Sequence, residues 1–167
     1  SSAASDVYKR QIQYSFSTGG KRLRPFLIFY FGSLFNINKK SLFDLGMTVE
    51  LTHTYSLIHD DLPAMDNDDI RRGKPTIHKK FDEATAILCG DALQVIAFSN
   101  IVKSKNISDN HKIKIMDLLC ECSGLDGLIS GQSLDLKMIK SSNILNINKM
   151  QDLKTGALFK FCFVSLG

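Results

Sequence analysis

The strongest constraint on the fold is a predicted helix face that leads into a run of carboxylates. The positions that recur at i, i+4, i+7 and i+11 along this face are Met47, Leu51, Thr54 and Ile58. Pro63 predicts the end of the helix, because a proline ring does not fit a helix interior. Five aspartates fall between positions 60 and 69, and two arginines follow at once. Carboxylates this dense repel one another, so we expect a cation or hydrogen bonds to compensate them.

Most of the remaining chain also predicts helices, over residues 26–35, 84–102, 112–129 and 147–166. The first follows Pro25, a common helix-start residue, although its aromatic content also allows a buried strand. The segment 84–102 is apolar nearly all round, which predicts a core helix. Turns are predicted at 36–40, 103–110 and 140–146, and no strand alternation persists. The predicted fold class is all-α.

Length and composition point to one ordinary domain. The chain has 167 residues, 44% of them apolar and 23% charged, as in soluble globular proteins. The net charge of +4 is mild and the basic residues are scattered, so no nucleic-acid partner is predicted. The longest apolar run, 26–35, is too short to span a membrane, and no signal peptide is visible. We expect an appended tail at 1–11 and part of a single helical domain at 12–167.

The cysteines predict a reducing, cytoplasmic location. Cys89, Cys120, Cys122 and Cys162 form no Cys-x-x-Cys pair, and buried free thiols are expected. A metal or redox pair of Cys120 and Cys122 is the alternative, although that spacing suits zinc poorly.

The acidic segment predicts a cation site with oxygen ligands. Asp60 and Asp61 end the predicted helix, and Asp66 follows a loop that contains proline. Three such carboxylates suit Mg²⁺, which keeps waters and completes its shell with phosphate oxygens. A solvated acidic loop is the alternative. A calcium-binding EF-hand loop starting at Asp66 is excluded, because Arg71 stands where glycine is required and Ile77 where glutamate is required.

Other polar residues share helix faces with these carboxylates. His53 and Asp60 are seven residues apart and therefore lie on one face, with Ser56 between them on the same side. In another predicted helix, Gln132 and Asp135 are three residues apart. An aspartate carried inward on a helix needs a compensating cation or hydrogen bonds.

Basic residues gather in three short clusters. These are Lys21, Arg22 and Arg24 after a Gly-Gly pair, Arg71 and Arg72 after the aspartates, and Lys154 beside Thr155 in the last predicted helix. Arginine makes bidentate phosphate contacts and lysine supplies a point charge. Each cluster alone is commonly a solvated surface. Together with the acidic segment, the clusters favour a pair of diphosphates, one of them held through metal. A P-loop is excluded, because Lys21 is followed by arginine instead of serine or threonine.

Five ordered motifs resemble the trans-isoprenyl diphosphate synthase family, and within it the bacterial farnesyl diphosphate synthases. The motifs are GGKRLRP at 19–25, HDDLPAMDNDDIRRGKPTIH at 59–78, GDAL at 90–93, GQSLDL at 131–136 and KTGALF at 154–159. The resemblance covers residues 14–167. It implies a helical prenyltransferase fold around a central cavity and a homodimer in the complete protein. It also implies a Mg²⁺-dependent head-to-tail condensation of isopentenyl diphosphate with dimethylallyl or geranyl diphosphate.

The resemblance also implies residue roles. Asp60, Asp61 and Asp66 would bind magnesium. Isopentenyl diphosphate would be bound by Lys21, Arg24, His53 and Arg72, and the allylic diphosphate by Arg71, Lys154, Thr155 and Gln132. Of these, the aspartates, Arg71 and Lys154 are the expected catalytic residues, and Asp135 lies in a motif that faces the same cavity. Ionisation places negative charge on the leaving diphosphate, which metal and fixed cations stabilise most in the transition state.

Tyr55, with Ser56 beside it, is the expected chain-length determinant. Tyr55 precedes Asp60 by five residues, ~7.5 Å along a helix. The resemblance implies that a bulky residue there stops elongation at a C15 product, whereas a smaller one favours C20. A packed core tyrosine is the alternative.

The family's second aspartate-rich motif is absent from this sequence. We therefore expect the chain alone not to turn over, and a non-catalytic partner of a prenyltransferase is an alternative to the enzyme. A geranylgeranyl diphosphate synthase is the alternative for the product. A terpene cyclase is less favoured, because GGKRLRP and KTGALF point to isopentenyl diphosphate. Among the histidines, His59 is expected to pack beside or orient Asp60, and His78 and His111 are expected at the surface or in loops.

Overall fold

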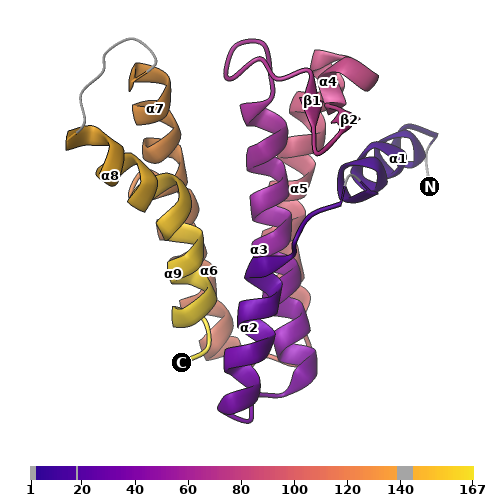
Figure 1. Cartoon of the computed structure of the whole chain (residues 1–167). Coiled ribbons are helices and arrows are strands. Elements are labelled where there is room, and N and C mark those ends of the chain that lie inside the picture. The colour runs from indigo at the N-terminus through magenta and orange to yellow at the C-terminus, as the bar shows by residue number, and fades with distance from the viewer. Residues whose placement is uncertain (1–2, 18, 139–144) are drawn as a thin grey trace. The chain divides into compact units, whose positions relative to one another are not determined.

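The computed structural model describes residues 3–17, 19–138 and 145–167, and it is helical as predicted (Figure 1). The helices are α1 (Ala3–Ser17), α2 (Leu23–Leu34), α3 (Lys39–Asp60), α4 (Ile77–Lys80), α5 (Glu83–Lys103), α6 (Asp109–Ser123), α7 (Leu128–Met138), α8 (Leu145–Gln151) and α9 (Ala157–Val164), with the π-helical turn η1 (Asp152–Gly156) between the last two. Two short strands, β1 (Ile70–Arg71) and β2 (Lys74–Pro75), complete the fold. Contacts divide the chain into unit 1, residues 1–21 and 51–97, and unit 2, residues 22–50 and 98–167.

Several predicted boundaries were wrong. The helix predicted over 112–129 is two helices, because α6 stops at Ser123 and α7 begins at Leu128. Gly124 and Gly127 lie between them, and a Cβ on Gly124 would approach the Cys120 carbonyl oxygen to 2.5 Å. The chain therefore turns too tightly here for side chains. The predicted turn at 140–146 falls largely outside the described residues, and its last two positions belong to α8.

The hairpin of β1 and β2 was not predicted. Its strands are only two residues long, with Ile70 opposite Pro75 and Arg71 opposite Lys74. The two turn residues, Arg72 and Gly73, both have positive φ, 52° and 75°. Positive φ at both central positions is what a two-residue type I′ turn requires. So short a hairpin has no hydrophobic alternation, and the sequence pattern could not reveal it.

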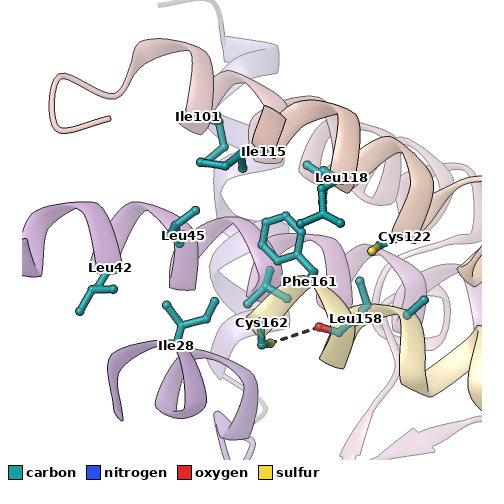
Figure 2. Packing of buried hydrophobic residues seen from close by; sticks show 13 residues of the cluster. Ile28, Leu42, Leu45, Ile101, Ile115, Leu118, Cys122, Leu158, Phe161 and Cys162 are labelled. Carbon is teal, nitrogen blue, oxygen red and sulfur yellow. Dashed lines mark hydrogen bonds between the residues drawn. The ribbon is translucent and has the colours of Figure 1, made fainter. Parts of the chain in front are cut away.

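Unit 2 contains a hydrophobic core formed by five helices (Figure 2). Ile28 comes from α2, Leu42, Leu45 and Val49 from α3, Ile101 from α5, Ile115, Leu118, Leu119 and Cys122 from α6, and Ala157, Leu158, Phe161 and Cys162 from α9. Phe161 is fully buried, and Cys162 donates its thiol to the Leu158 carbonyl oxygen at 3.1 Å (Figure 2). Burial of this apolar surface stabilises unit 2 and holds α9, and with it the preceding turn η1, against α6 and α2.

In unit 1, hydrogen bonds join α1 to the second short strand. Tyr14 of α1 donates its hydroxyl to the Pro75 carbonyl oxygen at 2.8 Å, and Lys74 donates to the Ser17 carbonyl oxygen at 2.8 Å. Residues 3–17, which include most of the expected tail, are helical in the structure. These bonds attach the C-terminal end of α1 to the β1–β2 hairpin.

Helix α5 has the predicted bounds to within one residue, but it is not enclosed on all sides. Its buried apolar side chains form a single stripe at helical spacing and are Ala86, Cys89, Leu93, Ala97 and Ile101. Ile87, Leu88, Val95, Ile96 and Val102 are each 40% exposed or more among the described residues. By length and composition α5 alone among the described helices could cross a membrane, with a mean hydropathy of 1.5. A core helix of a globular protein passes the same test.

The cysteines are free thiols, and three of the four are buried. Cys89, Cys122 and Cys162 are buried, whereas Cys120 is exposed. Burial raises the pKa of Cys89 to about 11 and that of Cys162 to about 12. A thiol with so high a pKa is not ionised near neutral pH and is therefore a poor metal ligand or nucleophile.

Candidate functional site

The acidic site lies at the C-terminal end of α3 in unit 1. Asp60 and Asp61, the last residue of α3 and the first beyond it, are 8% and 4% exposed. The backbone N–H of Asp66 donates to the Asp60 carbonyl oxygen at 2.8 Å, which folds the loop back onto the helix end. The three residues expected to bind metal are therefore close along the backbone. Nevertheless, no three His, Cys, Asp or Glu side chains among the described residues are arranged as a metal-binding group.

Arg71 forms an ion pair with one of these carboxylates, Asp61. It donates its Nε to Asp61 Oδ1 at 2.7 Å, and its Nη2 lies 2.5 Å from the same oxygen. A longer contact of 3.3 Å joins Nη2 to Asp68 Oδ2. The remaining neighbour, Asp69, pairs with Lys79 at 2.9 Å. The crowded carboxylates are thus compensated in part by basic side chains of the chain itself.

Burial dominates the electrostatics of Asp61. Its pKa is raised above the ordinary value because burial disfavours the charged form, and the hydrogen bond and positive charge of Arg71 only partly offset this effect. Ionised Asp61 is therefore incompletely compensated. A carboxylate in this state favours the approach of a further cation, and oxygen ligands of this kind suit magnesium.

The hairpin directs two consecutive arginines to two different places within unit 1. Arg71 reaches the end of α3, as described above. Arg72, at the positive-φ turn, donates its Nη1 to the Gly19 carbonyl oxygen. A Cβ on Gly20 would lie 2.9 Å from Arg72 Cζ, so only glycine leaves room for the guanidinium. Arg72 therefore packs on the Gly-Gly turn that directly precedes Lys21, whose side chain is exposed.

The remaining basic residues of the first motif lie in unit 2. Arg22, with φ 47° at the start of α2, donates to the carboxylate of Glu50, a buried residue that the sequence analysis did not single out. Arg24 lies with Cζ 5.0 Å from the centre of the Phe159 ring, a cation–π distance. Both contacts join residues far apart in sequence, and no periodic pattern predicts them.

The last turns of α3 before the aspartates carry His53, Tyr55 and Ser56. Tyr55 is 7% exposed, and its hydroxyl has no hydrogen-bond partner among the described residues. Burial first, and the charge of Asp60 second, raise the pKa of Tyr55 to about 12. Ser56 donates its hydroxyl to the His53 carbonyl oxygen at 2.8 Å, so this donor is satisfied within the helix. His53 is partly buried.

Two histidines hold loops and helices of unit 1 in place. His59 Nε2 lies 3.1 Å from the Ile87 carbonyl oxygen and 3.8 Å from Asp91 Oδ1, so this histidine bridges α3 and α5. A Cβ on Gly90 would lie 2.8 Å from His59 Cε1, which explains the glycine of the GDAL motif. The prediction of a surface or loop position was wrong for His78, which is 7% exposed with Nδ1 3.1 Å from the Thr76 hydroxyl. It was right for His111, which is exposed.

In unit 2 the residues of the GQSLDL and KTGALF motifs meet where α7 packs on η1. A Cβ on Gly131 would lie 2.7 Å from Lys154 Cα, so the two backbones touch at this glycine. Lys154 Nζ lies 2.6 Å from Asp135 Oδ2. Gln132 is 8% exposed, and neither atom of its amide has a hydrogen-bond partner among the described residues. Thr155, beside Lys154, is exposed. The motifs thus bring a cation and an unsatisfied buried amide to one helix pair.

The π-helical form of η1 is a feature that sequence reasoning missed. Lys154 occupies the middle of this turn, inside the continuous helical stretch of α8 and α9. π-Helical turns are rare and occur frequently at functional sites. A separate pocket of about 360 Å³ lies elsewhere in unit 2 and is lined in part by Ser41, Leu45, His111, Lys114 and Leu166. It contains none of the predicted site residues.

Comparison with known proteins places these observations in a family. A sequence model of the polyprenyl synthetase family matches residues 5–166. The farnesyl diphosphate synthase of Haemophilus influenzae is 47% identical over 151 residues, which cover 88% of this chain and 50% of that protein. That of Micrococcus luteus is 46% identical over 157 residues, 93% of this chain and 54% of that protein.

Solved structures agree with the sequence relatives. The crystal structure of a geranyltransferase from Legionella pneumophila matches with a TM-score of 0.92 at 43% identity, over 95% of this chain and 57% of that one. This chain therefore spans about half the length of the curated relatives that it matches. With the match over nearly the whole sequence, the chain belongs to the polyprenyl synthetase family and has the family's all-α prenyltransferase fold.

Proposed function

We propose that this chain carries part of a short-chain prenyl diphosphate synthase. The complete protein would condense isopentenyl diphosphate head-to-tail with dimethylallyl or geranyl diphosphate to give farnesyl diphosphate. The observation that carries the proposal is that the consecutive residues Arg71 and Arg72 make contacts at two different places. One guanidinium reaches the acidic end of α3, and the next reaches the Gly-Gly-Lys turn. A condensation of two diphosphates needs two such anion sites, and arginine suits diphosphate oxygens.

Unit 1 would supply the metal-dependent part of the chemistry. Asp60, Asp61 and Asp66 would hold Mg²⁺, which supplies Lewis acidity at the leaving diphosphate when bound. Buried carboxylate oxygens and the raised pKa of Asp61 support this assignment. Arg71 would bind the allylic diphosphate and stabilise the negative charge that develops on it in the transition state. Arg72, Lys21 and His53 would bind isopentenyl diphosphate.

Unit 2 would supply further contacts to both substrates. Lys154 and Thr155 would bind the allylic diphosphate. The buried amide of Gln132, which has no hydrogen-bond partner among the described residues, supports a polar contact to the same substrate. Arg24 would bind isopentenyl diphosphate. The substrate carbocation must be sheltered from water until the double bond of isopentenyl diphosphate attacks. The proton lost afterwards would pass to the released diphosphate, so no protein nucleophile is needed. The complete protein would be a homodimer.

Tyr55 would set the product length. It is buried directly before the acidic helix end, and its hydroxyl lacks a partner among the described residues, which fits a side chain at a cavity wall. A phenol ring there would limit the length of the growing chain. Replacement by alanine would open this space and lengthen the product.

A chimeric enzyme tests the proposal, because this chain spans half of its relatives. Residues 14–167 would replace the matching segment of the Haemophilus influenzae farnesyl diphosphate synthase. With isopentenyl and geranyl diphosphates and Mg²⁺, we expect a C15 product by chromatography of the dephosphorylated alcohols. Asp60→Asn with Asp61→Asn should abolish it, and Tyr55→Ala, but not Tyr55→Phe, should shift it beyond C15. A folded chimera without turnover would overturn the function, and an unchanged Tyr55→Ala product would overturn the length assignment.

A further inference from the structure

We propose that Asp135 is a positioning residue that holds the Lys154 ammonium ready for diphosphate, an inference that rests on the proposed role of Lys154. Asp135 makes no contact with substrate in this proposal. It acts through the lysine, whose Nζ lies 2.6 Å from Asp135 Oδ2.

The close contact between the backbones of α7 and η1 brings Asp135 and Lys154 together. Gly131 lets the α7 backbone touch the backbone of Lys154, since a Cβ there would lie 2.7 Å from Lys154 Cα. Asp135 follows Gly131 by four residues and therefore lies one turn further along the same face. The glycine sets the distance between the two backbones, and the aspartate on the next turn reaches the end of the lysine side chain.

The surroundings strengthen the pair relative to a surface ion pair. The side chains of Lys154 and Asp135 are 23% and 28% exposed, so water screens their attraction incompletely. By contrast, Lys160 and Glu121, also in unit 2, form a pair at 2.5 Å with side chains that are half exposed. That second pair joins α9 to α6 and provides a matched control.

Holding the lysine in advance lowers the entropic loss on binding. A free lysine side chain has many rotamers, and fixing it on a ligand loses this freedom. An ammonium group has three N–H donors, so one lysine can donate to a carboxylate and to a diphosphate oxygen at the same time. The carboxylate itself repels an anion, so its two effects on diphosphate binding oppose each other. If Asp135 positions Lys154, its favourable effect on diphosphate binding exceeds its repulsion of the anion only while the lysine is present.

This opposition defines a test on the chain itself, with inorganic pyrophosphate as the probe. The affinity would be measured from the backbone amide signal of Thr155 in NMR titrations. We expect Lys154→Ala to weaken binding, and Asp135→Ala to weaken it about fivefold in the native background. In the Lys154→Ala background, Asp135→Ala should leave binding unchanged or strengthen it. Asp135→Asn, which keeps the side-chain volume, should act in the same direction as Asp135→Ala, and Asp135→Glu should recover part of the affinity.

The outcomes separate this inference from the proposed function. Glu121→Ala removes an acidic partner of a lysine elsewhere in unit 2 and should leave the affinity unchanged. If Lys154→Ala weakens binding but both Asp135→Ala and Asp135→Asn leave it unchanged or stronger, positioning by Asp135 is wrong and the lysine assignment stands. If Lys154→Ala leaves binding unchanged, the assignment of Lys154 to diphosphate fails and positioning fails with it.

Discussion

Arg71 directs two of its guanidinium nitrogens at a single carboxylate oxygen of Asp61, Nε at 2.7 Å and Nη2 at 2.5 Å. This arrangement explains why arginines directly follow the aspartate-rich segment. One of them is the counter-charge of a carboxylate that α3 carries into a buried position. In the proposed function the same guanidinium also faces the allylic diphosphate, so Arg71 would serve both the fold and the site.

The Arg71–Asp61 pair should contribute measurably to stability. Arg71→Ala leaves a buried carboxylate without its cation, and we expect the free energy of unfolding to fall by about 1–3 kcal/mol in urea denaturation followed by circular dichroism. Adding Asp61→Asn should recover part of the loss, because the uncompensated charge is removed. Lys79→Ala breaks an exposed pair with Asp69 and should change stability little. Equal losses for Arg71→Ala and Lys79→Ala would contradict this account.

The glycine at position 90 should not tolerate a methyl group. Gly90→Ala places a Cβ against the His59 ring, so we expect a loss of about 1–3 kcal/mol in thermal or urea unfolding. Gly46→Ala is the matched control, since its Cβ would make only ordinary contacts of 3.5 Å or more in α3. Alanine has the higher helix propensity, so Gly46→Ala should stabilise by about 0.5–1 kcal/mol. Trimming the ring with His59→Ala should rescue Gly90→Ala, and a Gly90→Ala protein as stable as the parent would refute the clash.

Tyr55 should make the fold sensitive to alkali. Its pKa is about 12 in the folded chain against 10.0 ordinarily, so the folded state binds the proton more tightly than the unfolded state. Stability is therefore fully present below about pH 10 and declines as the pH rises through 12. In titrations of tyrosine absorbance, Tyr55→Phe should remove the component with the highest pKa. It should also flatten the loss of stability in this window. If Tyr55→Phe instead removes a tyrosine titration near pH 10, Tyr55 is not buried from water as described.

Thiol reactivity should separate Cys120 from the other cysteines. Cys120 is exposed, whereas burial raises the pKa of Cys89, Cys122 and Cys162 and lowers their thiolate fraction. With a thiol-reactive dye at pH 8 we expect one fast equivalent and three slow ones. Cys120→Ser should abolish the fast phase alone, and denaturant should make all the remaining thiols react quickly. A fast phase that survives Cys120→Ser would place another thiol at the surface.

Local pattern accounts for the parts of the fold that the sequence predicted. The i, i+4, i+7 spacing in residues 47–58 and the proline after them predicted the helix that ends at Asp60, and α3 does end there. The apolar run at 26–35 likewise became a helix, α2, instead of the alternative strand. These features depend on the 3.6-residue period and on proline, which act within a few residues.

Local sequence patterns could not predict contacts between residues far apart in the chain. The sequence contained Arg22 and Glu50, His59 and Gly90, and Asp135 and Lys154, but nothing in it paired them. The buried position of His78 was mispredicted for the same reason, since neighbouring residues do not determine what packs over a side chain. The break between α6 and α7 was missed because the helical pattern continues across two glycines whose tight turn only packing makes evident.

The sequence by itself determined the helical class, the family and the residue types of the proposed site, because periodicity and motif order are local and can be read along the chain. The tertiary structure decided which charges compensate one another. It directed Arg71 to Asp61 and Arg72 to the Gly-Gly turn through a hairpin whose two-residue strands are too short to leave a pattern. It also brought Asp135 to Lys154 through a glycine that allows two backbones to touch. Such pairings depend on distances in space, which one-dimensional spacing does not encode.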